Sequence, residues 1–203
     1  AKVRRVSDPE HWKASETDLK ECIRLDPNMP EAYFDLADLY LSRNMPEESL
    51  EYCELGAGLL PDSPLGFYYR AAAELQMDEL DDALADIQQA YMKDITHIPT
   101  YRMMGEIYRA RGDLPNSLEP LEMFTKYERN DATAWIWLGQ AYAAVGANDD
   151  AINAFSRALE ISKVLYDAYL GRGEVYLTIE QTELAREDCK IAVRTRPEAF
   201  ESH

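Results

Sequence analysis

Apolar residues recur along this chain at the spacing of one helical face. In residues 132–165 the first such set is Trp135, Leu138, Gly139 and Tyr142, which is the i, i+3, i+4, i+7 pattern of an amphipathic helix. After Gly146 comes a second set: Ala151, Ile152, Phe155, Ala158 and Leu159. No alternating run indicates a strand. The pattern therefore predicts a helix, a turn and a second helix.

The same pattern returns at a constant interval along the chain. Its leading aromatic position is occupied by Tyr33, Phe67, Tyr101, Trp135 and Tyr169. Small residues recur in phase with it at Ser49, Ala83, Ser117, Ala151 and Ala185. A fixed period of this length, too long for one helix, is typical of proteins that stack copies of one unit. Counted from Pro30, the units are 30–63, 64–97, 98–131, 132–165 and 166–199.

Residues 1–29 contain no full unit. Asp8 followed by Pro9 indicates a helix start, and Trp12, Leu19 and Ile23 give that helix one apolar face. We expect this helix to cover the first repeat. The chain would then form a single solenoid over residues 1–199, with 200–203 as a tail and about 11 helices in total.

The unit resembles the tetratricopeptide repeat (TPR), a motif of about 34 residues whose pattern is W-x2-L-G-x2-Y followed by small, aromatic and small positions. The matching residues are Trp135, Leu138, Gly139, Tyr142, Ala151, Phe155 and Ala158. The resemblance extends over five tandem units and covers 170 of the 203 residues. It implies an all-α fold, a right-handed superhelical TPR solenoid of antiparallel helix pairs.

Charged residues stand at three apolar positions of that family pattern. Arg70 and Arg172 replace a core leucine, and Glu74 replaces the tyrosine. Because an arginine stem is apolar, we expect these stems to cover apolar surface while their charged heads reach water or a neighbouring acid such as Glu74.

The chain is strongly acidic, with a net charge of −17. The first two units carry most of it, −7 and −5. This distribution disfavours nucleic acid as a partner, because nucleic acid selects clustered Lys and Arg. A partner with basic residues would be steered towards the N-terminal repeats.

No residues suited to catalysis or metal binding stand together. His11, His97 and His203 have no nucleophile or ligand at helical spacing, and the glycines fall at repeat positions and turns. We therefore expect neither an enzyme nor a cofactor.

The three cysteines, Cys22, Cys53 and Cys189, occupy positions that look buried. An odd number without short spacing favours small core residues in a reducing compartment. No apolar run approaches the ~18 residues of a membrane span. We expect a cytoplasmic protein, although a removed signal peptide would leave no trace.

The TPR resemblance also implies a binding surface, because in that family the first helices line a concave groove that holds an extended peptide. The second residue of each unit should face this groove, together with its fifth, sixth, ninth and twelfth residues. The candidates are Phe34, Asp38, Leu41, Tyr68, Tyr69, Leu75, Arg102, Glu106, Arg109, Ile136, Trp137, Gln140, Leu170 and Glu174. Exposed aromatic and arginine side chains dominate binding at interfaces. The alternative is that Tyr68, Tyr69 and Trp137 pack between neighbouring helices.

One TPR subclass clamps the C-terminal carboxylate of chaperones with Lys, Arg and Asn side chains. From the first unit, the corresponding residues here are Phe34, Asp38, Tyr69, Pro99 and Met103. The corresponding residues counted from the second unit or from the third unit also do not supply this combination of Lys, Arg and Asn. We therefore do not expect a carboxylate-clamp chaperone binder.

The sequence thus favours a non-catalytic protein–protein interaction scaffold that binds a peptide or protein segment. Two alternatives remain open. The chain could be the regulatory or targeting segment of a larger multidomain enzyme, or a structural scaffold that self-associates.

Overall fold

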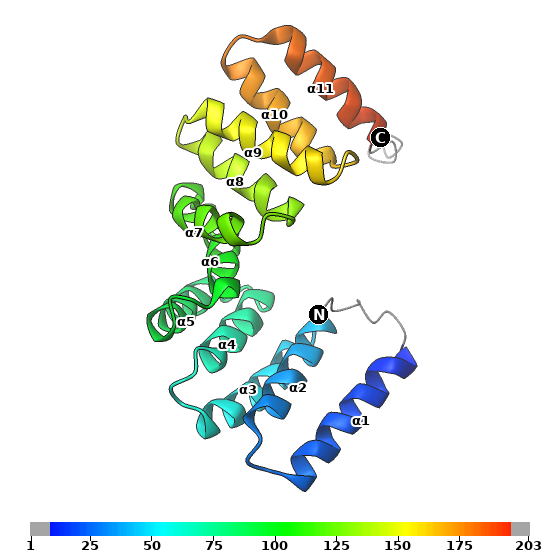
Figure 1. Ribbon diagram of the computed structural model, residues 1–203, viewed down its shortest axis with the longest axis vertical. Helices are drawn as coiled ribbons and strands as arrows, with labels where there is room; N and C mark the ends of the chain where they lie inside the picture. Colours follow the sequence, from blue (N-terminus) through cyan, green and yellow to red (C-terminus); the bar gives the residue numbers. More distant parts are fainter. Residues whose placement is uncertain (1–8, 196–203) are drawn as a thin grey trace. The chain divides into compact units, whose positions relative to one another are not determined.

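The computed structural model describes residues 9–195, which contain eleven α-helices and no strand (Figure 1). The helices are α1 (Pro9–Leu25), α2 (Pro30–Ser42), α3 (Pro46–Leu59), α4 (Leu65–Gln76), α5 (Leu80–Lys93), α6 (Ile98–Ala110), α7 (Leu114–Tyr127), α8 (Ala132–Ala144), α9 (Asn148–Ile161), α10 (Tyr166–Thr178) and α11 (Thr182–Thr195). The predicted all-α fold of helix pairs is confirmed. So is the helix expected before the first repeat, although Asp8 lies outside the described residues.

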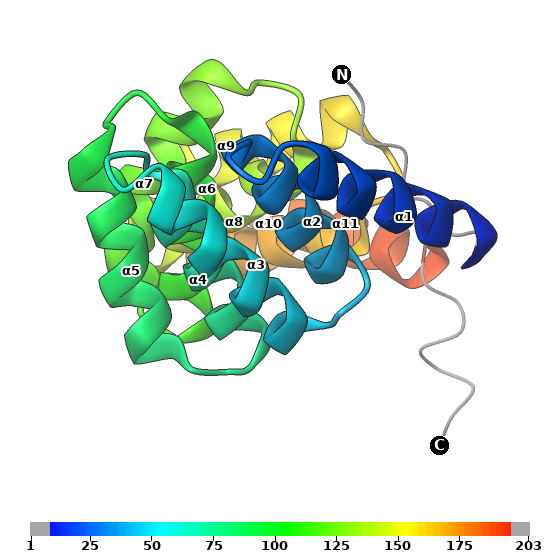
Figure 2. The same ribbon diagram turned by 90° about the horizontal axis from the view of Figure 1, so that it is seen from below.

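The helices form two compact units, residues 1–103 and 104–203. In the first, α2 lies between α1 and α3, and α4 packs on α3 and α5 (Figure 1, Figure 2). In the second, α8 packs on α7 and α9, and α10 on α9 and α11. The first helices of successive repeats also contact each other, α2 with α4 and α8 with α10. The single solenoid over 1–199, with its repeat boundaries, stays a prediction.

The turn inside each repeat contains one residue in the left-handed backbone region. These residues are Asn44, Asp78, Gly112, Gly146 and Glu180, with φ of 58°, 63°, 74°, 77° and 61°. They recur with the same period as the aromatic positions of the sequence. Asn, Asp and Gly adopt this conformation more readily than other residues, so four of the five turns have a suitable residue there.

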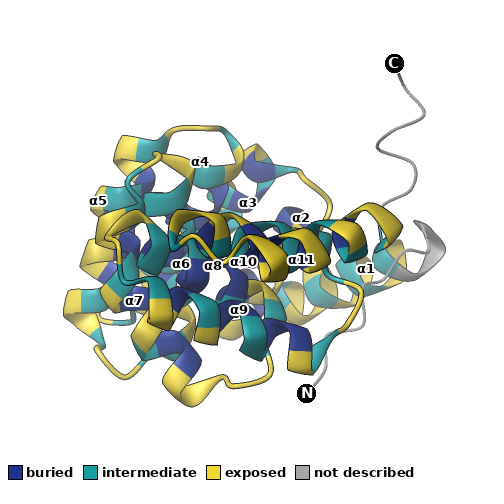
Figure 3. Cartoon of the chain, turned by 90° about the horizontal axis from the view of Figure 1, so that it is seen from above, coloured by how far each residue is buried: buried dark blue, intermediate teal, exposed yellow. Residues whose placement is uncertain are grey.

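Adjacent helices of the second unit approach closely because glycine faces a large aromatic ring. Phe155 of α9 is buried, and a methyl group added at Gly139 of α8 would lie 2.8 Å from its ring. A methyl group at Gly171 of α10 would lie only 2.5 Å from the same ring. One side chain therefore fills the space between three helices. Figure 3 shows such buried positions on the helix faces that meet their neighbours.

Three of the five recurring aromatic residues connect their repeat to the loop before it. Tyr33 and Tyr101 donate hydroxyl hydrogen bonds to the carbonyl oxygens of Pro27 and Ile95, at 3.1 and 2.7 Å. Trp135 donates its Nε1–H to the corresponding carbonyl oxygen, that of Arg129, at 3.0 Å. In each case the acceptor lies in the loop that precedes the repeat, so the same position that packs between helices also satisfies a loop carbonyl group.

The two unusual arginines form ion pairs across their own helix pair. Arg172 of α10 donates from Nε and Nη2 to the carboxylate of Asp188 on α11, at 2.7 and 2.8 Å. Arg70 of α4 likewise forms a bidentate ion pair with Asp86 on α5, in which Nε and Nη2 each donate to one carboxylate oxygen. The sequence suggests Glu74 as a partner of Arg70, but its Oε1 lies 4.0 Å from Arg70 Nε. The main partner is therefore Asp86, which faces the arginine across the helix pair.

Glu74 occupies an unfavourable position beside the Arg70–Asp86 pair. Burial, and then the negative charge of Asp86, raise the pKa of Glu74 to about 7, although Arg70 acts in the opposite direction. Its Oε2 is buried without a hydrogen-bond partner among the described residues. The ionised form is thus poorly stabilised in the folded chain.

One cysteine differs from the expectation that all three are core residues. Cys53 is buried and Cys189 is partly buried, but Cys22 is exposed. Cys22 lies on α1, the first described helix, which packs against α2. An end helix with one neighbour leaves part of its surface open, whatever its apolar pattern.

The close contact at Phe155 leads to a prediction about glycine. Gly139→Ala should lower the free energy of unfolding by about 1–3 kcal/mol, because overpacking outweighs the better helix propensity of alanine. Gly58→Ala is the matched control, since Gly58 also lies in a helix but nothing lies within 4 Å of an added methyl group. That change should be neutral or stabilising. Urea unfolding followed by circular dichroism measures both, and equal effects would contradict the packing argument.

Glu74→Gln should stabilise the chain at high pH. The folded-state pKa lies above the ordinary value of 4.5, so the unfavourable contribution of Glu74 grows as the pH rises from that value through about 7. We expect a gain of about 2 kcal/mol at about pH 8, most of which disappears at about pH 5.

Glu51→Gln removes the same charge from an exposed position and should show no such pH dependence. Urea unfolding at both pH values measures the difference. An identical pH profile for the two variants would refute the role assigned to Glu74.

Candidate functional site

A concavity of the second unit lies on its first helices. It has a volume of about 740 Å³, with walls from the last turn of α6, from α8 and from α10, and Phe155 among its lining residues. Four predicted groove residues line it: Arg109, Gln140, Leu170 and Glu174. We call this cavity the groove. The sequence thus placed residues from three successive repeats on a common surface.

Arg109 is the distinctive side chain of the groove. Its guanidinium carbon lies 4.8 Å from the centre of the Trp137 ring, within the range of a cation–π contact. Its Nε is buried and has no hydrogen-bond partner within the described residues. A buried donor without an acceptor is unfavourable, so an acceptor supplied by a ligand would be stabilising.

Other groove residues supply polar groups of both kinds. Gln140 offers an amide that donates and accepts, while Glu174 and Asp167 offer carboxylate oxygens. Asp167 is the second residue of its repeat, a position that was expected to face the groove. The turn residues Gly112 and Gly146 also line it, and the sequence did not predict them. The position of these turns beside the groove depends on how the helices pack.

Two of the remaining candidates in the first unit are buried. Phe34 is only 2% exposed and stacks on Tyr69, with ring centres 5.8 Å apart, and Leu41 is also buried. Phe34 and Leu41 therefore pack within the unit rather than present a contact surface. This corrects the expectation, because the neighbouring helix α4 covers these positions.

The aromatic candidates of α4 stay half-buried, as does Leu75. Tyr69 contacts Tyr68 edge-on at 5.3 Å, and Tyr68 contacts His97 edge-on at 5.2 Å. Beside them, burial and then the charge of Asp35 raise the pKa of Asp38. Packing within the unit thus accounts for much of the arrangement of these side chains, which the sequence suggested as binding residues.

The other candidates divide between core and surface. Ile136 and Trp137 are buried in the core of the second unit, so the fifth and sixth positions of this repeat serve packing. Arg102 and Glu106 are half-buried on α6 and are not among the residues that line the groove. The arginine that lines it is Arg109.

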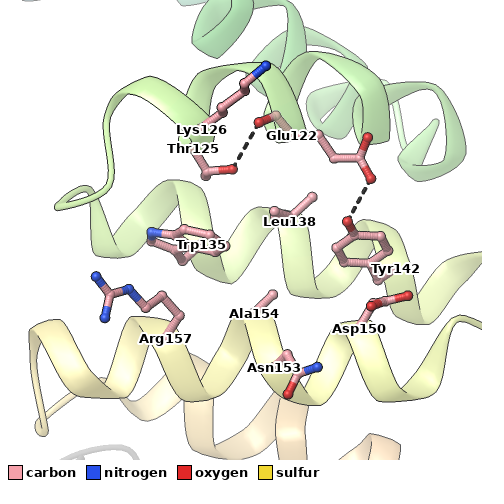
Figure 4. A pocket seen from close by; sticks show the side chains of 10 residues that line it. All are labelled: Glu122, Thr125, Lys126, Trp135, Leu138, Tyr142, Asp150, Asn153, Ala154 and Arg157. Atoms are coloured by element: carbon pink, nitrogen blue, oxygen red, sulfur yellow. Dashed lines mark hydrogen bonds between the residues drawn. The ribbon is translucent and has the colours of Figure 1, made fainter.

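A second recess of about 530 Å³ lies between α7, α8 and α9, and none of its residues was predicted as a site (Figure 4). We call it the α7–α9 pocket. Trp135, Leu138 and Tyr142 of α8 line it, together with Glu122 of α7 and Ala154 of α9. The Tyr142 hydroxyl donates to Glu122 Oε1 at 2.6 Å. Burial, followed by this bond and the nearby charge, raises the pKa of Tyr142.

Residues 9–195 include no helix long and apolar enough to cross a membrane. Within the same residues no group of three or more His, Cys, Asp or Glu side chains is placed to hold a metal ion.

Stacked antiparallel helix pairs with a recess on their first helices define a helical-repeat protein. A family model described as tetratricopeptide repeat matches residues 102–165. With the repeat pattern of the whole chain and the similar folds, this match supports a tetratricopeptide repeat protein.

Known proteins with similar sequences or folds agree with this assignment. Tetratricopeptide repeat protein 14 of Mus musculus is 26% identical over 151 residues, which cover 65% of this chain but only 20% of that protein. Among solved structures, YrrB, "a TPR protein with an unusual peptide-binding site", has a TM-score of 0.77 at 20% identity, covering 89% of this chain and 93% of its own. MamA 41-end from Desulfovibrio magneticus RS-1 has a TM-score of 0.73 at 18% identity, with 85% and 97% covered. These two structures show the shared fold.

Proposed function

We propose that this protein is a non-catalytic scaffold that binds an extended segment of a partner protein in the groove. The observation that carries the proposal is Arg109, whose buried Nε has no partner among the described residues at the edge of a recess built by three successive first helices. The likeness of the fold to YrrB, which is described as having a peptide-binding site, supports the proposal.

The groove chemistry suits a peptide with an acidic residue. Stacking on Trp137 orients the Arg109 guanidinium, and a carboxylate can then accept hydrogen bonds from its N–H groups. Gln140 can donate to and accept from a peptide backbone. Glu174 and Asp167 would accept from backbone N–H groups or from a basic residue further along the same segment.

For the first unit, we propose a preference for partners with basic residues. Glu31, Asp35 and Asp38 are all on α2, and burial together with neighbouring acids raises the pKa of both Asp35 and Asp38. A cation placed beside them would stabilise their ionised forms. The strong negative charge of the first two repeats supports the same preference.

Arg109→Ala should weaken peptide binding. Peptides selected on the purified chain from a displayed random library provide the ligands, and fluorescence anisotropy measures their affinity. We expect a loss of about tenfold or more for acidic peptides, because hydrogen bonds to charged groups contribute about 1.5–3 kcal/mol. Gln140→Ala should weaken the same peptides.

Arg186→Ala is the matched control. It removes the same charge from an exposed position of α11 that does not line the groove, and it should change affinity by less than about twofold. Circular dichroism checks that the helical content is unchanged. Selected peptides that bind Arg109→Ala and Gln140→Ala as tightly as the original chain would refute the groove assignment.

A further inference from the structure

The ion pair of the last repeat defines a site for a guanidinium group. Besides its two bonds to Asp188, Arg172 donates from Nη1 to Ser156 Oγ of α9 at 2.9 Å. Its guanidinium carbon also lies 5.8 and 5.9 Å from the ring centres of Tyr169 and Tyr176, two turns apart on α10. The guanidinium is thus bound by two aromatic rings, one carboxylate and one hydroxyl oxygen.

One repeat earlier, every member of this site has its counterpart in the α7–α9 pocket. The counterparts at the same repeat positions are Leu138 for Arg172, Ala154 for Asp188, Glu122 for Ser156, Trp135 for Tyr169 and Tyr142 for Tyr176. All five line the pocket. The arginine and its aspartate are replaced by shorter apolar residues, while both aromatic positions are retained. The hydroxyl of Ser156 is replaced by a carboxylate, which accepts from a guanidinium more strongly.

The recess therefore has both the space and the acceptors for a guanidinium. Its volume of about 530 Å³ falls within the range of small-molecule sites, so one long side chain fits. The Glu122 carboxylate accepts from the Tyr142 hydroxyl, and the Asp150 carboxylate lies beside the Tyr142 ring (Figure 4). Both charges make this end of the pocket electronegative.

Two cations also line the pocket, and both have contacts elsewhere. Arg157 pairs with Glu160 on its own helix, and its guanidinium lies at the Trp135 end in Figure 4. The Lys126 ammonium group lies 5.7 Å from the centre of the Tyr127 ring. In Figure 4 neither charged group lies beside the Tyr142 hydroxyl.

We propose that the α7–α9 pocket binds an arginine side chain of a partner protein, held by Trp135, Tyr142 and Glu122. This site is separate from the groove and does not depend on it. Arginine fits better than lysine, because a planar guanidinium stacks on aromatic rings and donates along its edge. The second repeat supports this geometry, since Arg70 there pairs with Asp86 and lies 5.3 Å from the centre of the Phe67 ring.

The test uses the isotopically labelled chain and the tripeptide acetyl-Gly-Arg-Gly-amide, followed by nuclear magnetic resonance. Because Trp135 Nε1–H is hydrogen-bonded to a loop carbonyl group, its indole signal is a suitable reporter, assigned with Trp135→Phe. We expect a saturable shift of this signal. The same tripeptide with citrulline, which has the same shape but no charge, should bind at least about tenfold more weakly.

Two variants locate the site. Leu138→Arg with Ala154→Asp installs the internal ion pair of the last repeat and should abolish the shift, detected on the backbone amides of α8. Glu122→Gln changes an exposed residue, leaves the fold intact and should weaken binding about tenfold. If Glu122→Gln binds like the original chain, or if arginine and citrulline bind alike, the proposal is wrong. A folded double variant that still binds the tripeptide at α8 would also overturn it.

Discussion

The close approach of neighbouring helices at glycine is the contact on which the second unit depends. Phe155 is buried where α8 and α10 each present a glycine, so a single ring contacts two successive repeats. A helix pair by itself leaves apolar faces exposed, and stacking covers them. The groove follows from this contact, because α8 and α10 must touch for Gln140, Leu170 and Glu174 to line one recess.

The position of the first helix that usually carries leucine is occupied in two different ways in these repeats. Where arginine replaces the usual leucine, an aspartate on the second helix of the pair compensates its charge, as in Arg172–Asp188. Where leucine stays and a small residue stands opposite, as at Leu138 and Ala154, the second helix leaves a recess. The same backbone therefore produces either an internal ion pair or a pocket. This is the physical basis for relating the α7–α9 pocket to an arginine site.

Much of the fold could be read from the sequence, because a helical face and a fixed period are local properties. The period also indicated the turns inside the repeats, such as the one at Gly146. The arginine partners were missed, although a signal was present. Asp86 and Asp188 occur only in the two repeats that carry arginine, whereas the other repeats have Tyr52, Pro120 and Ala154 at that position. A comparison of equivalent positions in the five repeats, in search of residues that change together, would have predicted these ion pairs.

The candidate site was only partly predictable. Arg109, Gln140, Leu170 and Glu174 line one recess. Phe34 and Ile136 occupy equivalent positions of their repeats and are buried. The difference depends on the residues of the next helix, which cover one position and leave another open. A position within a repeat therefore does not fix its exposure.

By itself, the sequence determined the period, the helix pairs, the turns and the acidic charge of the first two repeats, because each depends on neighbouring residues or on composition. The tertiary structure alone decided which carboxylates neutralise Arg70 and Arg172, which aromatic side chains are buried, and where recesses remain. These depend on distances between residues on different helices, and side-chain volume and packing set those distances.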